Sequence, residues 1–550
     1  MAQFDNIDCG FYGAYAQHGR DLVERYGTDG YFWVRLGFIG PAHLTYVFFG
    51  PLGGFYVLRY ILALVATVPL YLLLRQWHGK SLGLLGVVLV ITSPVFYNAW
   101  GDDYPDSAAL SYLLAASSLL LLQTRRRRDR ILVLFGSGAF YGLALHCQAV
   151  TAALVASAVG GYVAVMSVAR RRHTVRNTLW VDCAVIFGGI IAVSSLFVLI
   201  SWLWFGQWDI FSPTWRNYLW LRTPSQVANW HSANWRWSRT VPYVVLPPVL
   251  AGAWLLQVVF VRPRRAEVAA GVGAVLQIGA FYALQFVGDV ATVEFKSYSA
   301  MLWAPVTVLA ALILIGLIHT VVRNGKMLWL PVGAVVGVAL FWSFFSPTLD
   351  LRGGVRMIGA AATILLLGVL AVLYRRRIVA AFAVVGFVVV GFVVTTAPTA
   401  RPALPGTSPF TPHADYGRVL GHAAAEEIDA YRVAARIPAL VGPATAPGQQ
   451  LVFWWPYGAP GVVNQLSTEY LWRQLESGVP SAERLRTVVA QLRTMRPAPL
   501  VLIGADEHDF GRFLATLNDA GVRLHLRKAA RLESGSVSVV LWVVDVDASR

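Results

Sequence analysis

The 550-residue chain has little charge: only 13% of its residues are Asp, Glu, Lys or Arg, whereas an average soluble domain carries about 25%. Hydrophobic residues make up 57% of the chain, and the mean hydropathy is +0.57. A helix needs about 20 mainly apolar residues to cross the hydrocarbon core of a bilayer. This balance therefore excludes an ordinary water-soluble protein and indicates a polytopic, all-α membrane protein.

Cysteine and the common nucleotide and hydrolase motifs are also scarce. The three cysteines, Cys9, Cys147 and Cys183, show no paired spacing, which argues against a thiolate metal site or a disulfide framework. The sequence contains no H-x-x-x-H pair, no Walker A loop and no G-x-S-x-G elbow, so neither an ATP-driven pump nor a membrane serine hydrolase is expected. The first residues, MAQFDNIDC, lack the basic and apolar regions of a cleaved signal peptide.

Long apolar runs are abundant, and they predict about twelve membrane spans. The predicted spans cover residues 56–74, 81–98, 107–122, 131–146, 149–168, 179–205, 241–261, 268–288, 299–321, 328–346, 356–374 and 378–397.

The net charge of +16 comes from basic residues that cluster in short loops between the spans. If the spans alternate in direction, one set of loops holds 19 Lys and Arg, including the run RRRRDR at 125–130, and the opposite set holds six. The positive-inside rule places the arginine-rich loops in the cytoplasm. A nucleic-acid partner is therefore not expected.

The remaining segments then fall on the extracytoplasmic side, and the chain divides into four parts. Residues 1–55 form an acidic loop with interfacial helices, in which the stretch at 31–50 is interrupted by Gly40 and Pro41. A Pro-rich linker and a small C-terminal domain follow the membrane region. In that last part, strand-like runs such as QLVFWW, PLVLIGA and SVSVVLWVVDV alternate with helix-like runs at 417–436, 481–495 and 508–520, which predicts an α/β fold. The predicted parts are 1–55, 56–397, 398–415 and 416–550.

Acidic residues gather on the side opposite the arginines. The loop WGDDYPDS places Asp102, Asp103 and Asp106 at the mouth of two apolar helices, where an unpaired charge is costly and usually functional. Asp106 has a simpler alternative role as a helix N-cap. Asp5 and Asp8 lie ahead of an amphipathic stretch, for which a surface anchor and an active-site role stay equal alternatives.

Cations are few on this side. In GDVATVEFKSYSAMLWAP, Lys296 accompanies Glu294 and Tyr298 and is a candidate for holding a phosphate, although pairing with Glu294 or snorkelling would also explain it. Arg352 and Arg356 bracket a further outer turn, where anchoring to the bilayer surface is favoured over a phosphate contact.

This layout resembles the GT-C superfamily of membrane glycosyltransferases, in particular the protein-mannosyltransferase and aminoarabinose-transferase-like branch. In that branch the first outer loop carries an acidic residue before aromatic residues, and Asp5 or Asp8 in DNIDCGFY corresponds to it. The second outer loop carries an acidic residue at the start of a helix, and Asp106 in DDYPDSAALSYLL corresponds to that one. The family's E-x-R-Y element is approached by EFKSY, with Lys296 in place of Arg. The family has a membrane helix before the acidic loop, so the resemblance predicts a thirteenth span upstream of Met1.

The resemblance implies that a sugar moves from a polyprenyl-phosphate donor to a glycan, lipid or protein acceptor of the cell envelope, with inversion at the sugar. We expect Asp5 or Asp8, together with Asp103 or Asp106, to face one cavity at the outer surface, with one of the two first-loop acids as the base and Asp102, Glu294 and Tyr298 nearby. Lys296, Arg352 or Arg356 would hold the donor phosphate. No metal site is predicted, and dependence on a divalent metal stays open. The alternatives are a flippase for lipid-linked sugars, which would show repeated halves and charges near the bilayer centre, and a non-catalytic envelope scaffold.

Overall fold

The computed structural model divides the chain into two compact units, one of residues 19–417 and one of residues 418–550 together with 1–18. Each unit is described by itself. The residues that the structure describes are 33–91, 105–169 except 125, 173–221, 265–286, 452–455, 473–477, 500–504 and 523–547 except 536, with short pieces within 12–23, 247–258, 301–313, 432–440 and 511–519.

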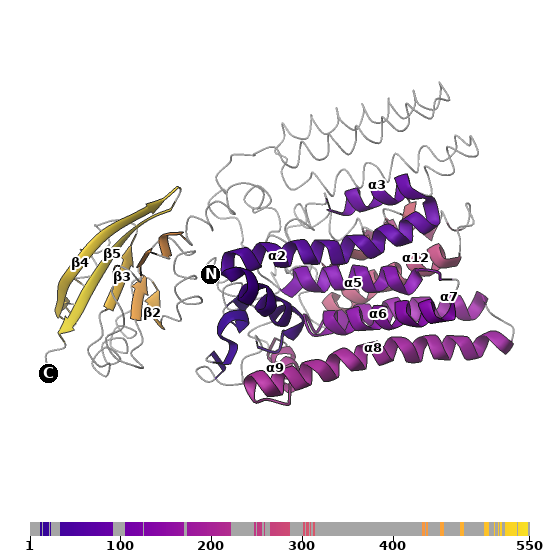
Figure 1. The fold of residues 1–550 in the computed structure, drawn as a ribbon, viewed down its shortest axis with the longest axis horizontal. Helices are drawn as coiled ribbons and strands as arrows, with labels where there is room; N and C mark the ends of the chain where they lie inside the picture. Colours follow the sequence, from indigo (N-terminus) through magenta and orange to yellow (C-terminus); the bar gives the residue numbers. More distant parts are fainter. Residues whose placement is uncertain are drawn as a thin grey trace, which may run out of the picture. The chain divides into compact units, whose positions relative to one another are not determined.

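The first unit is a bundle of apolar helices (Figure 1). Helix α2 packs against α3 and α5, α5 against α6, and α6 against α8, while α7 packs against α12. The helices are α2 (Leu36–His78), α3 (Lys80–Ile91), α5 (Pro105–Leu121), α6 (Arg127–Leu145), α7 (Thr151–Ala169), α8 (His173–Phe205), α9 (Ser212–Leu221) and α12 (Arg265–Phe286).

Three helical segments among the described residues are long and apolar enough to cross a membrane: Tyr56–His78, Leu179–Phe205 and Arg265–Leu284. They coincide with three of the predicted spans, and the shorter apolar helices α5 and α7 coincide with two more. The predicted spans at 328–346, 356–374 and 378–397 lie outside the described residues, so the count of twelve stays a prediction.

The start of α2 corrects the expected break at Gly40 and Pro41, because the helix runs through both residues. Proline lacks the N–H that would bond to the carbonyl four residues earlier. Here that carbonyl, Gly37 O, accepts a hydrogen bond from the Tyr112 hydroxyl at 3.2 Å. The break lies at Gly50 instead, where φ is +73°, a conformation that favours glycine. The Leu36–Gly50 segment is thus set apart from the span that follows.

Glycines let the helix backbones approach closely at two crossings. A Cβ on Gly138 of α6 would lie 2.0 Å from Ile186 O of α8, and one on Gly189 would lie 2.3 Å from Phe135 O. Between α7 and α12, a Cβ on Gly161 would lie 2.8 Å from the Gly273 Cα. Close approach over small residues is a common way for helices to associate in membranes.

The second unit contains a five-stranded sheet of order β2-β1-β3-β5-β4. Strand β1 (Val452–Trp455) pairs in parallel with β2 (Arg473–Ser477) and β3 (Leu500–Gly504), whereas β5 (Val537–Asp547) is antiparallel to β3 and β4 (Arg523–Ser534). Alternate residues of β5 form one buried face with β3 and a helical piece near 433–437. The sequence indicated neither β2 nor β4; a bulge between Leu526 and Lys528 interrupts the alternation of β4.

Candidate functional site

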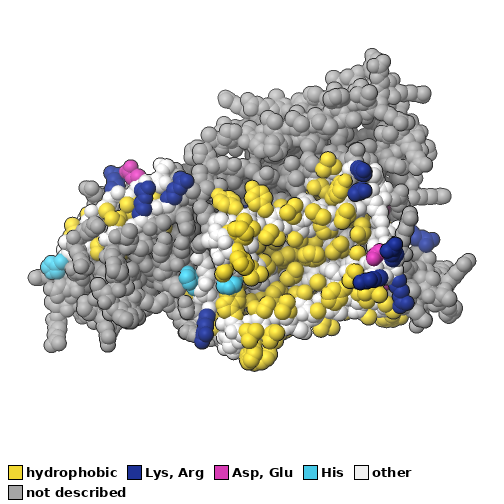
Figure 2. Space-filling view, in the orientation of Figure 1, with side chains coloured by type: hydrophobic (Ala, Val, Ile, Leu, Met, Phe, Trp, Pro, Cys, Tyr) yellow, Lys and Arg dark blue, Asp and Glu magenta, His cyan; other side chains and the backbone are white. Residues whose placement is uncertain are grey.

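The two ends of the helix bundle differ in charge. The end near His78, which we call the arginine-rich end, gathers dark blue side chains beside the apolar band in Figure 2. Its cations come from the start or end of several helices: Arg75, Lys80, Arg126, Arg127, Arg128, Arg130 and Arg265. The opposite end holds the start of α5, the α6–α7 turn and α9, and we call it the Asp106 end.

Asp106 is the second residue of α5 and is almost fully buried. Pro105 begins the helix, so Asp106 lies within the first turn and not at the N-cap position that the sequence allowed. The first turn of a helix favours a negative charge, because its backbone N–H groups and the helix dipole both point there. The position therefore suits an ionised carboxylate.

A second buried polar side chain contacts this carboxylate. Gln148, in the turn between α6 and α7, donates its Nε2 amide to Asp106 Oδ1 at 2.8 Å. The turn is held by the Thr151 hydroxyl, which lies 2.6 Å from Gln148 O and 3.0 Å from Ala144 O. It is also held by Gly37, whose N–H donates to His146 O at 3.1 Å. Three segments that are far apart in the sequence thus fix the surroundings of Asp106.

A buried cation lies in the same region. Arg35, immediately before α2, is 4% exposed, and both Arg35 and Asp106 are close enough to the Cys147 thiol to act on it electrostatically. Neither Arg35 nor Gln148 was identified from the sequence. The available signal was a single arginine within the aromatic stretch YFWVRLGF and a single glutamine in the LHCQAVT turn.

The other predicted site residues lie outside the described residues, so their convergence with Asp106 stays a prediction. They are Asp5, Asp8, Asp102, Asp103, Glu294, Lys296, Tyr298, Arg352 and Arg356. Within the part of the chain that is described, no group of three His, Cys, Asp or Glu side chains could hold a metal ion.

Aromatic rings connect the α6–α7 turn to α9. His146 Nε2 lies 3.0 Å from Ser194 Oγ, and the His146 ring contacts Phe197 and Phe211 with centroid distances of 5.0 and 5.8 Å. Asp209 Oδ1 accepts the backbone N–H groups of Phe211 and Ser212 at the start of α9. The Ser212 hydroxyl also donates to the Asp209 carboxylate, and this bond is the largest cause of a pKa below the usual value for Asp209. The two backbone bonds lower the pKa further.

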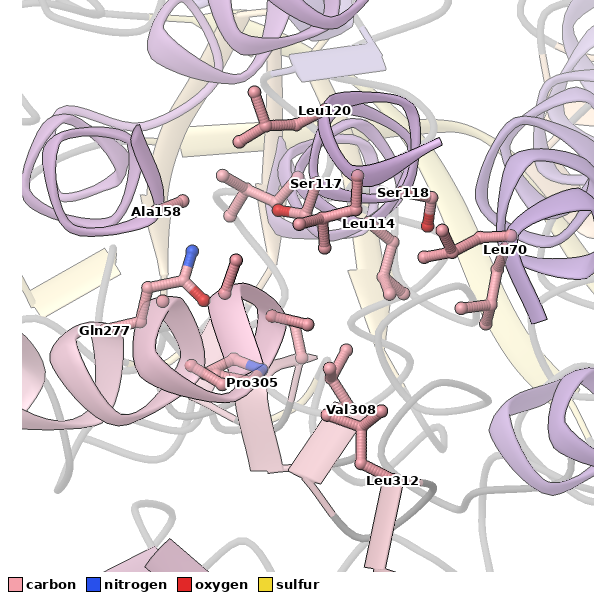
Figure 3. A pocket seen from close by; sticks show the side chains of 18 of the residues that line it. Leu70, Leu114, Ser117, Ser118, Leu120, Ala158, Gln277, Pro305, Val308 and Leu312 are labelled. Carbon is pink, nitrogen blue, oxygen red and sulfur yellow. The ribbon is translucent and has the colours of Figure 1, made fainter. Parts of the chain in front are cut away.

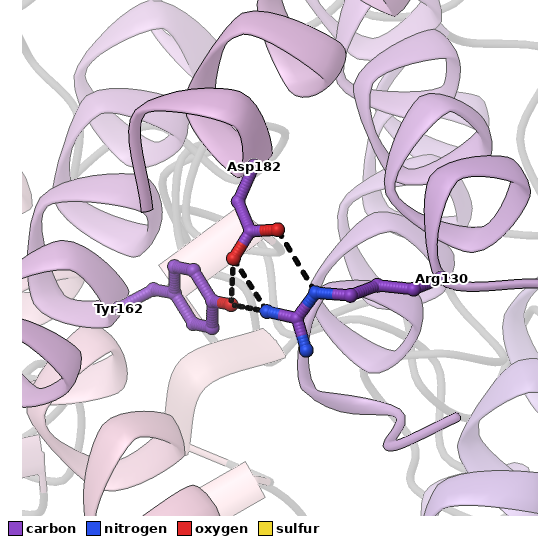
Figure 4. Close-up of polar contacts among 3 residues, drawn as sticks. All are labelled: Arg130, Tyr162 and Asp182. Carbon is purple, nitrogen blue, oxygen red and sulfur yellow. Dashed lines mark hydrogen bonds and ion pairs between the residues drawn. The ribbon is translucent and has the colours of Figure 1, made fainter. Parts of the chain in front are cut away.

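The arginine-rich end contains a polar cluster that the sequence did not indicate (Figure 4). Arg130 of α6 donates Nε to Asp182 Oδ1 at 2.9 Å, and its Nη2 contacts the other carboxylate oxygen. The Nη2 group also donates to the Tyr162 hydroxyl of α7 at 3.1 Å. Because Asp182 is buried inside α8, these bonds join three helices and offset the cost of a buried charge.

An apolar cavity lies between α2, α5, α7 and α12 (Figure 3). Leucine, valine and alanine side chains such as Leu70, Leu114 and Ala158 form most of its wall. Gln277 also lines it and donates to Leu154 O at 3.1 Å. None of the described lining residues is charged, so this part of the wall offers no partner for a phosphate.

The sequence matches the protein family described as dolichyl-phosphate-mannose-protein mannosyltransferase over residues 42–199. This range includes Asp106, Gln148 and the Arg130–Asp182 pair, whereas Arg35 lies just before it. No curated protein matches the sequence.

Solved structures with similar folds include ArnT from Cupriavidus metallidurans bound to undecaprenyl phosphate, which is 13% identical with a TM-score of 0.53, over 98% of this chain and 96% of that chain. The apo state of ArnT is 14% identical with a TM-score of 0.47, over 97% and 93%. The archaeal oligosaccharyltransferase AglB from Archaeoglobus fulgidus is 10% identical with a TM-score of 0.44, over 93% and 67%. At these identities the first match is evidence of a shared fold alone.

Proposed function

We propose that this chain, a membrane glycosyltransferase of the GT-C superfamily, takes its sugar from a polyprenyl-phosphate donor and transfers it to a cell-envelope acceptor at the Asp106 end. The observation that carries the proposal is the buried Asp106 carboxylate, held by Gln148 within the range of the family match. The undecaprenyl phosphate named for the structurally similar ArnT supports the class of donor.

In the proposed reaction, an acceptor hydroxyl attacks the anomeric carbon as the bond to the donor phosphate breaks. The attack comes from the face opposite the phosphate, so the sugar is inverted. A carboxylate takes the hydroxyl proton, and we assign this role to Asp5 or Asp8 of the first loop. Burial raises the pKa of a carboxyl group towards a value useful for a base.

Asp106 and Asp103 would form the second acidic side of the same cavity. The polyprenyl-phosphate leaving group needs cations, because charge develops on its oxygens as the bond breaks. Lys296, Arg352 and Arg356 are the candidates in the sequence, and buried Arg35 adds a cation near Asp106. A cation near the carboxylates would also lower the cost of burying them.

The orientation belongs to the same proposal. One set of loops holds 19 Lys and Arg and the opposite set holds six. This difference favours a cytoplasmic arginine-rich end and an extracytoplasmic Asp106 end. Transport of lipid-linked sugars is the alternative function for a polytopic chain, and the mannosyltransferase match does not favour it.

The test is an incubation of purified full-length protein in nanodiscs with polyprenyl-phosphate mannose, other polyprenyl-phosphate sugars and a membrane extract. The proposal predicts release of polyprenyl phosphate that depends on the acceptor, together with a labelled product. Unchanged donor with every sugar and acceptor fraction would contradict it. Movement of intact donor across the bilayer without release of polyprenyl phosphate would favour transport instead.

A further inference from the structure

Helix α9 is joined to the end of a membrane span by a short connection. The apolar segment Leu179–Phe205 of α8 is 27 residues long and ends one residue before Gly206. Gly206 has a φ of +69°, a conformation that favours glycine, and the chain turns there. Since α9 begins at Ser212, only six residues separate it from the end of the span. The helix is therefore held near the boundary between hydrocarbon and water.

One stripe of α9 is apolar and exposed. Phe211, just before the helix, and Trp215 and Leu219 within it follow at spacings of four residues, with 60%, 60% and 49% of each side chain exposed. Residues four apart lie on one side of a helix. Trp208 precedes the stripe, is 58% exposed and stacks on Trp202 of α8 at a centroid distance of 4.7 Å. Apolar surface therefore continues from the end of the span onto α9.

Exposed polar side chains lie at the edge of this stripe. Arg216 is exposed and lies about 100° around the helix from Trp215, whereas Ser212, seven residues before Leu219, begins the helix on the same side as Leu219. An exposed stripe of aromatic and aliphatic side chains with an arginine at its edge is typical of helices that lie in the membrane interface. Tryptophan is enriched at that level because its ring is amphipathic, and an arginine can extend its charged head towards lipid phosphates.

The base of α9 is fixed to the bundle. Ile210 is 2% exposed, and Pro213 is also buried. The Phe211 ring contacts His146, two residues before Gln148. The exposed stripe thus belongs to a helix that is packed against the bundle. One of its contacts is to the α6–α7 turn, which supplies the hydrogen bond to Asp106.

We propose that α9 lies in the interfacial layer of the bilayer at the Asp106 end, with Trp215 and Leu219 inserted among the lipids and Arg216 at the level of the phosphates. The partner of this surface is the lipid bilayer. The continuity of the apolar surface with a membrane span favours lipid over a sugar or another protein. Through Phe211 and His146, the bilayer then supports the turn that holds Gln148.

The experiment places single cysteines on the apolar stripe and at its polar edge in the full-length protein, in a background without Cys9, Cys147 and Cys183. The variants are Trp215→Cys and Leu219→Cys on the apolar stripe, and Arg216→Cys at its polar edge as the matched control. Each is labelled with an environment-sensitive fluorophore in phosphatidylethanolamine–phosphatidylglycerol nanodiscs. Quenching is measured with a lipid spin-labelled near its headgroup and with aqueous iodide. This readout does not require sugar transfer, so its failure and that of the proposed function are separate.

The proposal predicts blue-shifted emission at 215 and 219. Quenching by the spin-labelled lipid should be at least about twofold stronger at 215 than at 216, with correspondingly weaker quenching by iodide. Equal lipid quenching at 215 and 216, or stronger iodide quenching at 215 and 219 than at 216, would overturn it. Shielding from iodide that appears only when a saccharide is added would overturn it in favour of a sugar-stacking surface. Since 215 and 219 are tested separately, one poorly folded variant leaves the other to decide.

Discussion

Gln148 donates its side-chain amide to the Asp106 carboxylate over 2.8 Å, although the two residues are 42 positions apart in the sequence. Both side chains are almost fully buried. A hydrogen bond to a buried charged group is worth more than one between neutral groups, and its loss leaves the charge less well solvated. The geometry at Asp106 therefore depends on the α6–α7 turn.

We expect Gln148→Leu to lower kcat/KM for sugar transfer by about 10-fold to 100-fold, because the substitution removes the donor that orients Asp106. The matched control is Gln277→Leu, which also removes a buried amide hydrogen bond, that to Leu154 O, but near the apolar cavity. Activity is measured alongside thermal unfolding for both variants. Equal loss of activity in the two variants would show that Gln148 acts only through general stability.

Breaking the Arg130–Asp182 pair is expected to destabilise the bundle. Asp182→Leu should lower the free energy of unfolding by about 1 to 3 kcal/mol, less than for a fully buried pair because the Arg130 side chain is 33% exposed. The double variant Arg130→Met with Asp182→Leu should recover most of this loss, since no charge is left without its partner. The measurement is unfolding in detergent, and a double variant that loses the sum of the two single effects would contradict the account.

The contact between α6 and α8 gives a second stability prediction. Gly138→Ala should destabilise the protein by about 1 to 3 kcal/mol, because the added Cβ would lie 2.0 Å from Ile186 O and the helices would have to separate. Gly160→Ala in α7 is the control: nothing lies within 4 Å of the position that its methyl group would take, so only helix propensity changes. Thermal unfolding of the two variants decides, and equal stabilities would show that the close crossing is unimportant.

The orientation is tested by labelling intact cells with an impermeant thiol reagent. In the background without Cys9, Cys147 and Cys183, with Ser212→Cys at the Asp106 end and Arg127→Cys at the arginine-rich end, we expect labelling at 212 alone, and labelling at both positions after the cells are opened. Labelling of 127 but not 212 in intact cells would reverse the orientation and place the proposed reaction on the wrong side.

Periodicity and charge predicted most of the described membrane helices, because a span needs a long apolar run whatever its neighbours are. The continuation of α2 through Pro41 could not be predicted, since it depends on a hydroxyl from α5 that bonds to Gly37 O. The sequence identified Asp106 because it lies in a short acidic loop at the start of an apolar helix. The sequence did not identify Gln148, Arg35 and Asp182. Each interacts with residues that are distant in the sequence, and no local pattern records such interactions.

The most direct test of the central claim compares sugar transfer by the wild type and by Asp106→Asn, which keeps the shape and removes the charge of the side chain. The matched control is Asp129→Asn, at an exposed acid in the first turn of α6 at the arginine-rich end. With a labelled polyprenyl-phosphate sugar, the account predicts that Asp106→Asn lowers turnover by about 10²-fold to 10⁴-fold while Asp129→Asn stays near wild type. Wild-type turnover by a correctly folded Asp106→Asn variant would contradict the claim that sugar transfer takes place at the Asp106 end.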